Sequence, residues 1–115
     1  MITTHARERF AERTVHGIDD SGRQETVRLF IAWLDGGRWG VARVVDGQHR
    51  ENPHLARTDD WIFQGFEMAD ALAAANDALT TDLEVSRADG MNEDVRPFAE
   101  EELRRKLERW YFDHS

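Results

Sequence analysis

Short apolar runs separated by turn residues occupy the first half of the chain, a pattern typical of antiparallel strands. Residues 8–18 alternate loosely, with Phe10, Val15 and Ile18 as apolar positions, and they end at a cluster of Asp, Ser and Gly that favours a turn. Residues 26–34 are the clearest strand, because β-branched and aromatic side chains dominate them. The chain is therefore expected to begin with two strands.

An Asp-Gly-Gly sequence joins the second strand to a third apolar run at residues 38–45. Tight hairpin turns need the positive φ that glycine adopts without steric cost, so these two strands are expected to be antiparallel neighbours. Residues 48–60 show no periodicity and contain a proline, which predicts a surface loop. Apolar residues return at 61–66, where we expect a fourth strand.

Helical periodicity replaces the strand pattern from residue 67 onward. Over residues 67–84 apolar side chains recur every three or four positions, and six alanines accompany them. The stripe consists of Met68, Leu72, Ala75, Leu79 and Leu83. Asp70, Asp77 and Asp82 lie off this stripe and are expected to be exposed.

A second helix is predicted over residues 97–112. Pro97 is favoured in a first helical turn, where no amide donor is needed, and Leu103, Leu107 and Trp110 share one face. Glu-to-base pairs at i,i+4 each contribute roughly 0.2–0.5 kcal/mol to such a helix. The pairs are Glu100–Arg104, Glu101–Arg105 and Glu102–Lys106.

These elements predict one α+β domain over residues 1–115, with the sheet at about 8–66 and the helices at about 67–84 and 97–112. The expected fold is two-layer: an antiparallel sheet of three to four strands, a β-meander, is packed by one helix and followed by a second, C-terminal helix. Both faces of the second strand are apolar, whereas a sheet with one wet face alternates between apolar and polar residues. The second face is therefore expected to be covered within the chain, by the last helix, or else by a second subunit.

Composition excludes several classes of function. The chain has 115 residues and no Cys, so it has no disulfide framework, thiolate metal site or thiol nucleophile. Neither a membrane span nor a secretory signal is predicted, and a cytoplasmic location is expected. Lys106 is the one lysine among 15 basic residues, a bias typical of GC-rich bacterial genomes.

The net charge of −8 is concentrated in the helical half of the chain. Residues 1–65 carry 9 basic and 10 acidic side chains, and residues 66–115 carry 6 and 13. A strongly acidic chain is repelled by nucleic acid phosphates and by anionic lipid. Only a local patch of arginines would reverse that preference.

No pattern in the sequence indicates an enzyme. Ser21, Ser86 and Ser115 lie outside the motifs that activate a serine nucleophile. His16 lies in a predicted strand and would act as a base only with a nucleophile or an acid opposite it. We therefore expect no catalytic residue, no cofactor and no bound metal.

The loop at 48–60 holds the one cluster of metal-ligand residue types in the sequence. Its members are His49, Glu51, His54, Asp59 and Asp60. Their spacing and the lack of helical pattern favour a solvated polar loop over a zinc site. A small-molecule or metal site at 48–60 is the last of the functional alternatives.

A sheet face that carries arginines and aromatics would favour single-stranded nucleic acid, whose bases stack on aromatic rings. Such residues on or beside the central hairpin are Arg28, Phe30, Arg38, Trp39 and Arg43. The simpler interpretation is that the aromatics fill the core and the arginines pair with acidic neighbours across the strands. The net charge supports that interpretation, and nucleic acid binding is kept as the alternative function.

The last helix supplies the leading functional hypothesis. Trp110, Tyr111 and Phe112 are consecutive, and three consecutive side chains cannot all point inward from one helix. Tyr and Trp are enriched where protein interfaces concentrate their binding energy. We therefore expect this domain to act by protein–protein interaction or self-association, with these residues and the second sheet face as the partner surface.

Overall fold

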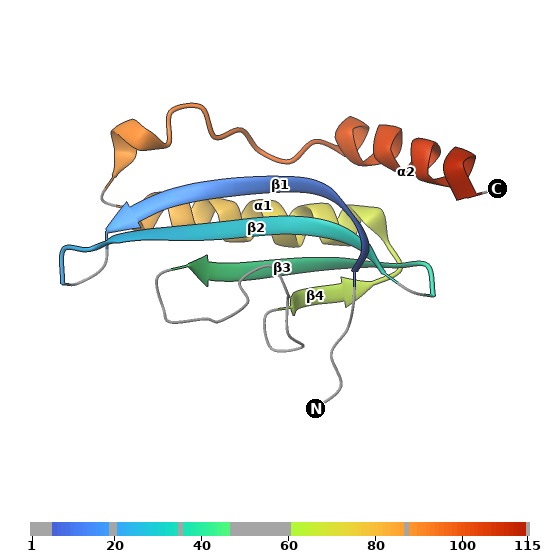
Figure 1. Ribbon diagram of the computed structural model, residues 1–115, viewed down its shortest axis with the longest axis horizontal. Coiled ribbons are helices and arrows are strands. Elements are labelled where there is room, and N and C mark those ends of the chain that lie inside the picture. Colours follow the sequence, from blue (N-terminus) through green and yellow to red (C-terminus); the bar gives the residue numbers. More distant parts are fainter. Residues whose placement is uncertain (1–5, 19–20, 35, 47–60, 87, 115) are drawn as a thin grey trace.

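The computed structural model describes residues 6–18, 21–34, 36–46, 61–86 and 88–114. Four strands form one antiparallel sheet in the order β1-β2-β3-β4, and helices follow them in the chain (Figure 1). The elements are β1 (Ala6–Ile18), β2 (Gln24–Leu34), β3 (Arg38–Asp46), β4 (Trp61–Gly65), α1 (Met68–Val85), the 3-10 helix η2 (Asp89–Met91) and α2 (Glu100–His114). The predicted α+β class is confirmed, with a four-strand meander, a packing helix and a C-terminal helix. No helix within these ranges is long and apolar enough to cross a membrane.

The β2–β3 hairpin forms the centre of the sheet. Leu34 pairs with Arg38 beside the turn, and the pairing continues without a break to Thr26 and Asp46 at the far end. Gly36 and Gly37 turn the chain with φ of 84° and 75°, values that residues with a side chain rarely adopt. The two glycines therefore set the register of the hairpin, as the sequence pattern indicated.

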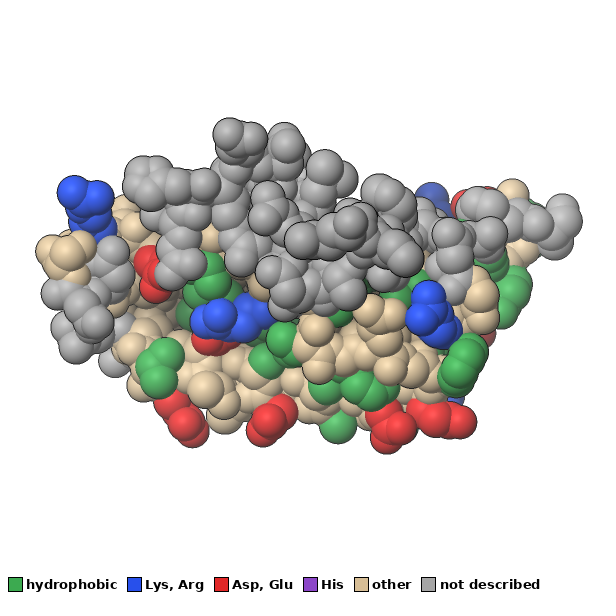
Figure 2. All heavy atoms as spheres, turned by 90° about the horizontal axis from the view of Figure 1, so that it is seen from below, with side chains coloured by type: hydrophobic (Ala, Val, Ile, Leu, Met, Phe, Trp, Pro, Cys, Tyr) green, Lys and Arg blue, Asp and Glu red, His purple; other side chains and the backbone are tan. Residues whose placement is uncertain are grey.

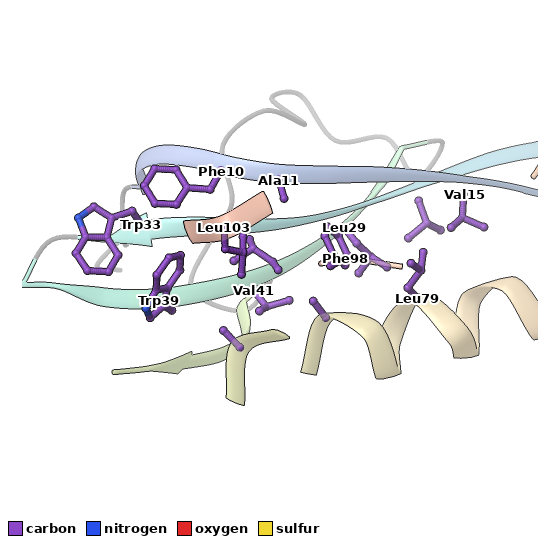
Figure 3. Close-up of a cluster of buried hydrophobic side chains, with 14 of the residues drawn as sticks. Phe10, Ala11, Val15, Leu29, Trp33, Trp39, Val41, Leu79, Phe98 and Leu103 are labelled. Atoms are coloured by element: carbon purple, nitrogen blue, oxygen red, sulfur yellow. The ribbon is translucent and has the colours of Figure 1, made fainter. Parts of the chain in front are cut away.

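The main core lies between the sheet and the helices (Figure 3). Leu29 and Ile31 of β2 and Val41 of β3 are fully buried there. The buried positions of α1 are Ala71, Ala75, Leu79 and Asp82. Leu72, predicted to belong to the apolar stripe, is only half-buried, whereas its neighbour Ala71 is fully buried. The small alanine side chains let the helix backbone lie close against the strands.

α2 packs on the same side of the sheet as α1. Leu103 is fully buried in the main core, and Phe98, which precedes the helix, is buried with it. The helix begins at Glu100 rather than at Pro97, because the Asn76 side chain binds both backbone groups of Phe98. Its Nδ2 donates to the Phe98 carbonyl at 3.0 Å and its Oδ1 accepts from the Phe98 amide at 2.7 Å.

The second face of the sheet is buried without either of these helices, so the expectation that the last helix covers it is wrong. Its buried side chains are Phe30, Ala32, Leu34, Ala42 and Val44. Trp61 of β4 packs edge-on against Phe30, and the Arg9 guanidinium lies 4.3 Å from the centre of the same ring. The sheet therefore has a core on both faces, with the two helices on one of them.

The segment between the helices runs along the outer edge of β1 (Figure 1). Asn92 is buried there, and its Oδ1 accepts from the His16 amide while its Nδ2 donates to the His16 carbonyl, each at 2.8 Å. The Ser86 hydroxyl also donates to the His16 carbonyl, at 2.6 Å. These side chains satisfy edge groups of β1 that would otherwise be free to pair with another chain.

An ion pair joins α1 to the sheet. Asp82, predicted to be exposed, is only 6% exposed and accepts from Arg43 of β3, with Nε–Oδ2 and Nη2–Oδ1 distances of 3.0 and 2.8 Å. The prediction was wrong because it counted apolar residues alone, whereas a paired carboxylate can occupy a buried position. The hydrogen bond to Asp82 raises the pKa of Arg43, against the opposing effect of burial.

Replacement of Arg43 and replacement of Asp82 are expected to lower the free energy of unfolding by different amounts. Arg43→Met leaves a buried carboxylate without its partner and should lower the free energy of unfolding by about 1–3 kcal/mol. Asp82→Asn should cost less, because the Arg43 side chain is 39% exposed and can reach water. Urea unfolding measures both effects, and an Arg43→Met/Asp82→Leu double variant should recover part of the loss.

Arg104→Met is the matched control. Arg104 pairs with Glu100 where both side chains are more than half exposed, so its loss should stay within about 0.5 kcal/mol of wild type. Equal losses for Arg43→Met and Arg104→Met would show that the Arg43–Asp82 pair contributes no more than a surface pair.

Candidate functional site

The three predicted partner residues of α2 differ in how deeply they are buried. Trp110 is half-buried, and its ring centroid lies 5.9 Å from that of Trp33 on β2. The ring of Tyr111 also packs against Trp33, with 6.3 Å between the ring centroids, yet 54% of the surface of Tyr111 is exposed. Phe112 is 83% exposed. The outward-facing part of this set is therefore Phe112 together with one side of Tyr111.

An aromatic cluster in the core supports this last turn of α2. Its members on the sheet are Phe10, Trp33 and Trp39, which lie close together in Figure 3. Trp33 lies 4.9 Å from Trp39 and is stacked on Phe10 at 6.3 Å with an interplanar angle of 7°. Trp110 and Tyr111 add to the cluster from the helix, with 5.2 Å between their own rings. Such ring pairs contribute about 0.5–1.5 kcal/mol each beyond the area they bury, so the last turn is held firmly on the sheet.

A further exposed aromatic lies at the same end of the molecule. Phe66 is 71% exposed and follows Gly65, which pairs with Trp39 at the end of β4. The C-terminus of α2, the β2–β3 turn and the start of α1 all lie at this end (Figure 1). We define the aromatic end as Phe66, Tyr111 and Phe112. The exposed apolar residues Ile18, Val85 and Met91 belong to the opposite end, where β1 and α1 finish.

The structure does not bring the five predicted nucleic acid residues onto one face. Trp39 and Arg43 lie on the side of α1, where Trp39 is 3% exposed and Arg43 binds Asp82. Arg28, Phe30 and Arg38 lie on the other side, where Phe30 is 2% exposed. Neither aromatic ring is exposed for base stacking. Arg38 donates to Gln64 on β4 at 3.1 Å.

Charge on the side of the molecule seen in Figure 2 is mixed. Among the coloured side chains, basic groups are separated from one another, and most acidic groups lie along the lower margin with others farther in. The predicted loop at 48–60 lies outside the described residues. Within the described part of the chain, no group of three His, Cys, Asp or Glu side chains is placed to hold a metal ion.

Arg13 of β1 is a residue that sequence reasoning missed. Its five N–H donors are all engaged: Nε binds the Arg96 carbonyl at 2.8 Å, and the two terminal nitrogens bind the Glu12 and Pro97 carbonyls and both oxygens of Glu102. Its guanidinium also lies 4.6 Å from the centre of the Phe98 ring. No local pattern marks this residue, because Glu102 is 89 positions away in the sequence.

The contact with Arg13 changes the predicted charge pairs of α2. Arg104 and Arg105 bind Glu100 and Glu101 as expected, at 2.8 and 2.6 Å. Glu102 binds Arg13 instead of Lys106, at 2.8 Å. The second face of the sheet, expected to contribute to a partner surface, is buried in the chain.

A groove of about 480 Å³ opens beside Arg13, between residues 96–99 and the first turns of α2. It is lined by Arg13, Arg96, Pro97, Ala99, Glu101, Glu102, Arg105 and Lys106. We call it the basic groove, since four cations face two carboxylates. Burial alone would raise the pKa of Glu102, but hydrogen bonds from Arg13 and the Ala99 amide, with the charges of Arg13 and Lys106, hold it below its ordinary value.

The depressed pKa of Glu102 predicts a loss of stability in acid. A carboxylate whose pKa is lowered by folding contributes its full stabilisation above the unfolded value of about 4.5, and loses it as the pH falls through the folded value. Glu102→Gln should therefore be less stable than wild type at neutral pH, and the difference should shrink below pH 4.5. Urea midpoints measured from neutral to acid pH test this. Glu101→Gln, an exposed neighbour, is the control; equal pH profiles for the two variants would contradict the assignment.

Models of protein families, curated proteins and solved structures give no match to this chain. A functional assignment therefore depends on the two surfaces described, the aromatic end and the basic groove.

Proposed function

We propose that this chain is a protein-interaction domain that self-associates through its aromatic end. The observation that carries the proposal is the exposure of Tyr111 and Phe112 on a helix that is otherwise anchored in the core. Large aromatic side chains cost free energy when they remain in water, and they are enriched where protein interfaces concentrate their binding energy. Phe66 adds a third exposed ring at the same end of the sheet.

The support beneath these rings favours binding. Tyr111 packs on Trp33 and on Trp110, so its ring has little conformational freedom to lose on association. Binding surfaces that are already ordered avoid the entropy cost of fixing side chains, which is about 0.5–1.5 kcal/mol for each flexible one. Tyr111 is thus preorganised by the core of the domain.

Charge around Phe112 supports a second copy of the chain as the partner. Glu108 and Arg109 lie one helical turn before Phe112 and are both exposed. In a two-fold interface each contact occurs twice, so Arg109 of one copy can face Glu108 of the other in both directions. A patch that carries both signs is complementary to itself, although the whole chain has a charge of −8.

Removal of the exposed rings should weaken self-association. We expect wild type to form a dimer in a concentration series followed by size-exclusion chromatography with light scattering. Tyr111→Ala and Phe112→Ala should each raise the dissociation constant about tenfold or more, which corresponds to about 1.4 kcal/mol. Met91→Ala is the matched control, because Met91 is a large apolar residue as exposed as Tyr111, at 54%, and it lies at the opposite end.

Charge reversal tests the two-fold arrangement. Glu108→Arg and Arg109→Glu should each weaken the dimer, and the double variant should restore it, since the pair is exchanged in both copies. A wild-type chain that stays monomeric at the highest concentration would overturn the proposal. The proposal would also be overturned if Met91→Ala raised the dissociation constant of the dimer as much as Phe112→Ala does.

A further inference from the structure

The basic groove is a second surface, separate from the aromatic end. Its cations come from three parts of the chain: Arg13 from β1, Arg96 from the segment before α2, and Arg105 and Lys106 from α2 itself. Only the fold brings these residues together. Four cations against the carboxylates of Glu101 and Glu102 leave two positive charges in excess, within a chain of net charge −8.

The excess charge can be assigned to particular side chains. Arg13 is neutralised by Glu102, and all its donors are used within the chain. Arg105 binds Glu101, but both side chains are more than 70% exposed, and such pairs contribute little in water. Arg96 and Lys106 have no ion pair with a carboxylate anywhere in the part of the chain that the structure describes. Arg96, Lys106 and Arg105 are therefore available to bind an anion.

The floor of the groove is preformed. Arg13 holds the carbonyls of Arg96 and Pro97, and the Asn76 side chain holds both backbone groups of the adjacent Phe98. A ligand does not need to order this segment before it binds. The volume of the groove also lies within the range of about 300–1,000 Å³ that is usual for ligand sites.

We infer that the basic groove binds an acidic segment of a partner protein, with its Asp or Glu side chains on Arg96, Arg105 and Lys106. When Arg105 turns from Glu101 to the ligand, Glu101 loses its donor, and a peptide can supply a backbone N–H group in its place. Nucleic acid phosphates are acceptors alone and would face Glu101 with no donor to offer. Pro97 and Ala99 add apolar surface to the groove, and the aliphatic parts of peptide side chains can pack against it.

The test uses a fluorescein-labelled oligoglutamate peptide and the full chain, with anisotropy as the readout. At an ionic strength of about 0.01 M the screening length is about 30 Å, and binding should be detectable there and weaken as salt is added. Arg96→Glu and Lys106→Glu should each raise the dissociation constant about tenfold, a change of about 1.4 kcal/mol. Urea unfolding of both variants checks that the fold is retained.

Arg104→Glu is the matched control. Arg104 is exposed and pairs with the glutamate four residues earlier, as Arg105 does, but it does not line the groove. Phe112→Ala should leave peptide binding unchanged, which separates this inference from the proposed self-association. Absence of binding at low ionic strength overturns the inference, as does an equal loss for Arg104→Glu. A single-stranded oligonucleotide that binds more tightly than the peptide and displaces it would assign the groove to nucleic acid instead.

Discussion

Burial of β2 on both faces is the constraint on which the rest of this structure depends. From Val27 to Leu34 every side chain except that of Arg28 is buried, and the same strand is paired on both edges. At about 25 cal/mol for each Å² of apolar surface, such a strand stabilises a fold only if both of its faces are covered. The two helices cover one face, so they must share it, and this places α2 beside β1 rather than across the sheet.

The position of α2 in turn creates both candidate surfaces. Arg13 fixes the approach to the helix through the Arg96 and Pro97 carbonyls and through Glu102, and Leu103 buries the helix itself. A helix held at its beginning and along one face presents its last turn at the end of the sheet. The aromatic end and the basic groove are thus two consequences of one anchored helix.

Both surfaces include residues of α2, at different heights along the helix. The basic groove uses Glu101, Glu102, Arg105 and Lys106 from its first turns, whereas Tyr111 and Phe112 lie in its last turn. Arg105 and Phe112 are seven residues apart, so they lie on the same side of the helix and about 10 Å apart along its axis. A dimer of this chain would carry two basic grooves, and two linked sites raise the apparent affinity for a partner that has two acidic segments.

The local pattern along the chain was sufficient to predict the strands, the Gly36-Gly37 turn and both helices, because each depends on nearby residues: β-branched runs, positive φ and a 3.6-residue period. It also indicated that Trp110, Tyr111 and Phe112 cannot all be buried. It did not predict that Asp82 would be buried, that Glu102 would pair with Arg13 instead of Lys106, or that Trp39 and Phe30 would lie on opposite faces of the sheet. Those outcomes depend on pairing between residues far apart in the chain, and a charged or aromatic side chain has the same local signature whether its partner is water or a distant residue. The elements were therefore determined by the sequence alone, whereas the surfaces available for function were decided by the tertiary packing of α2.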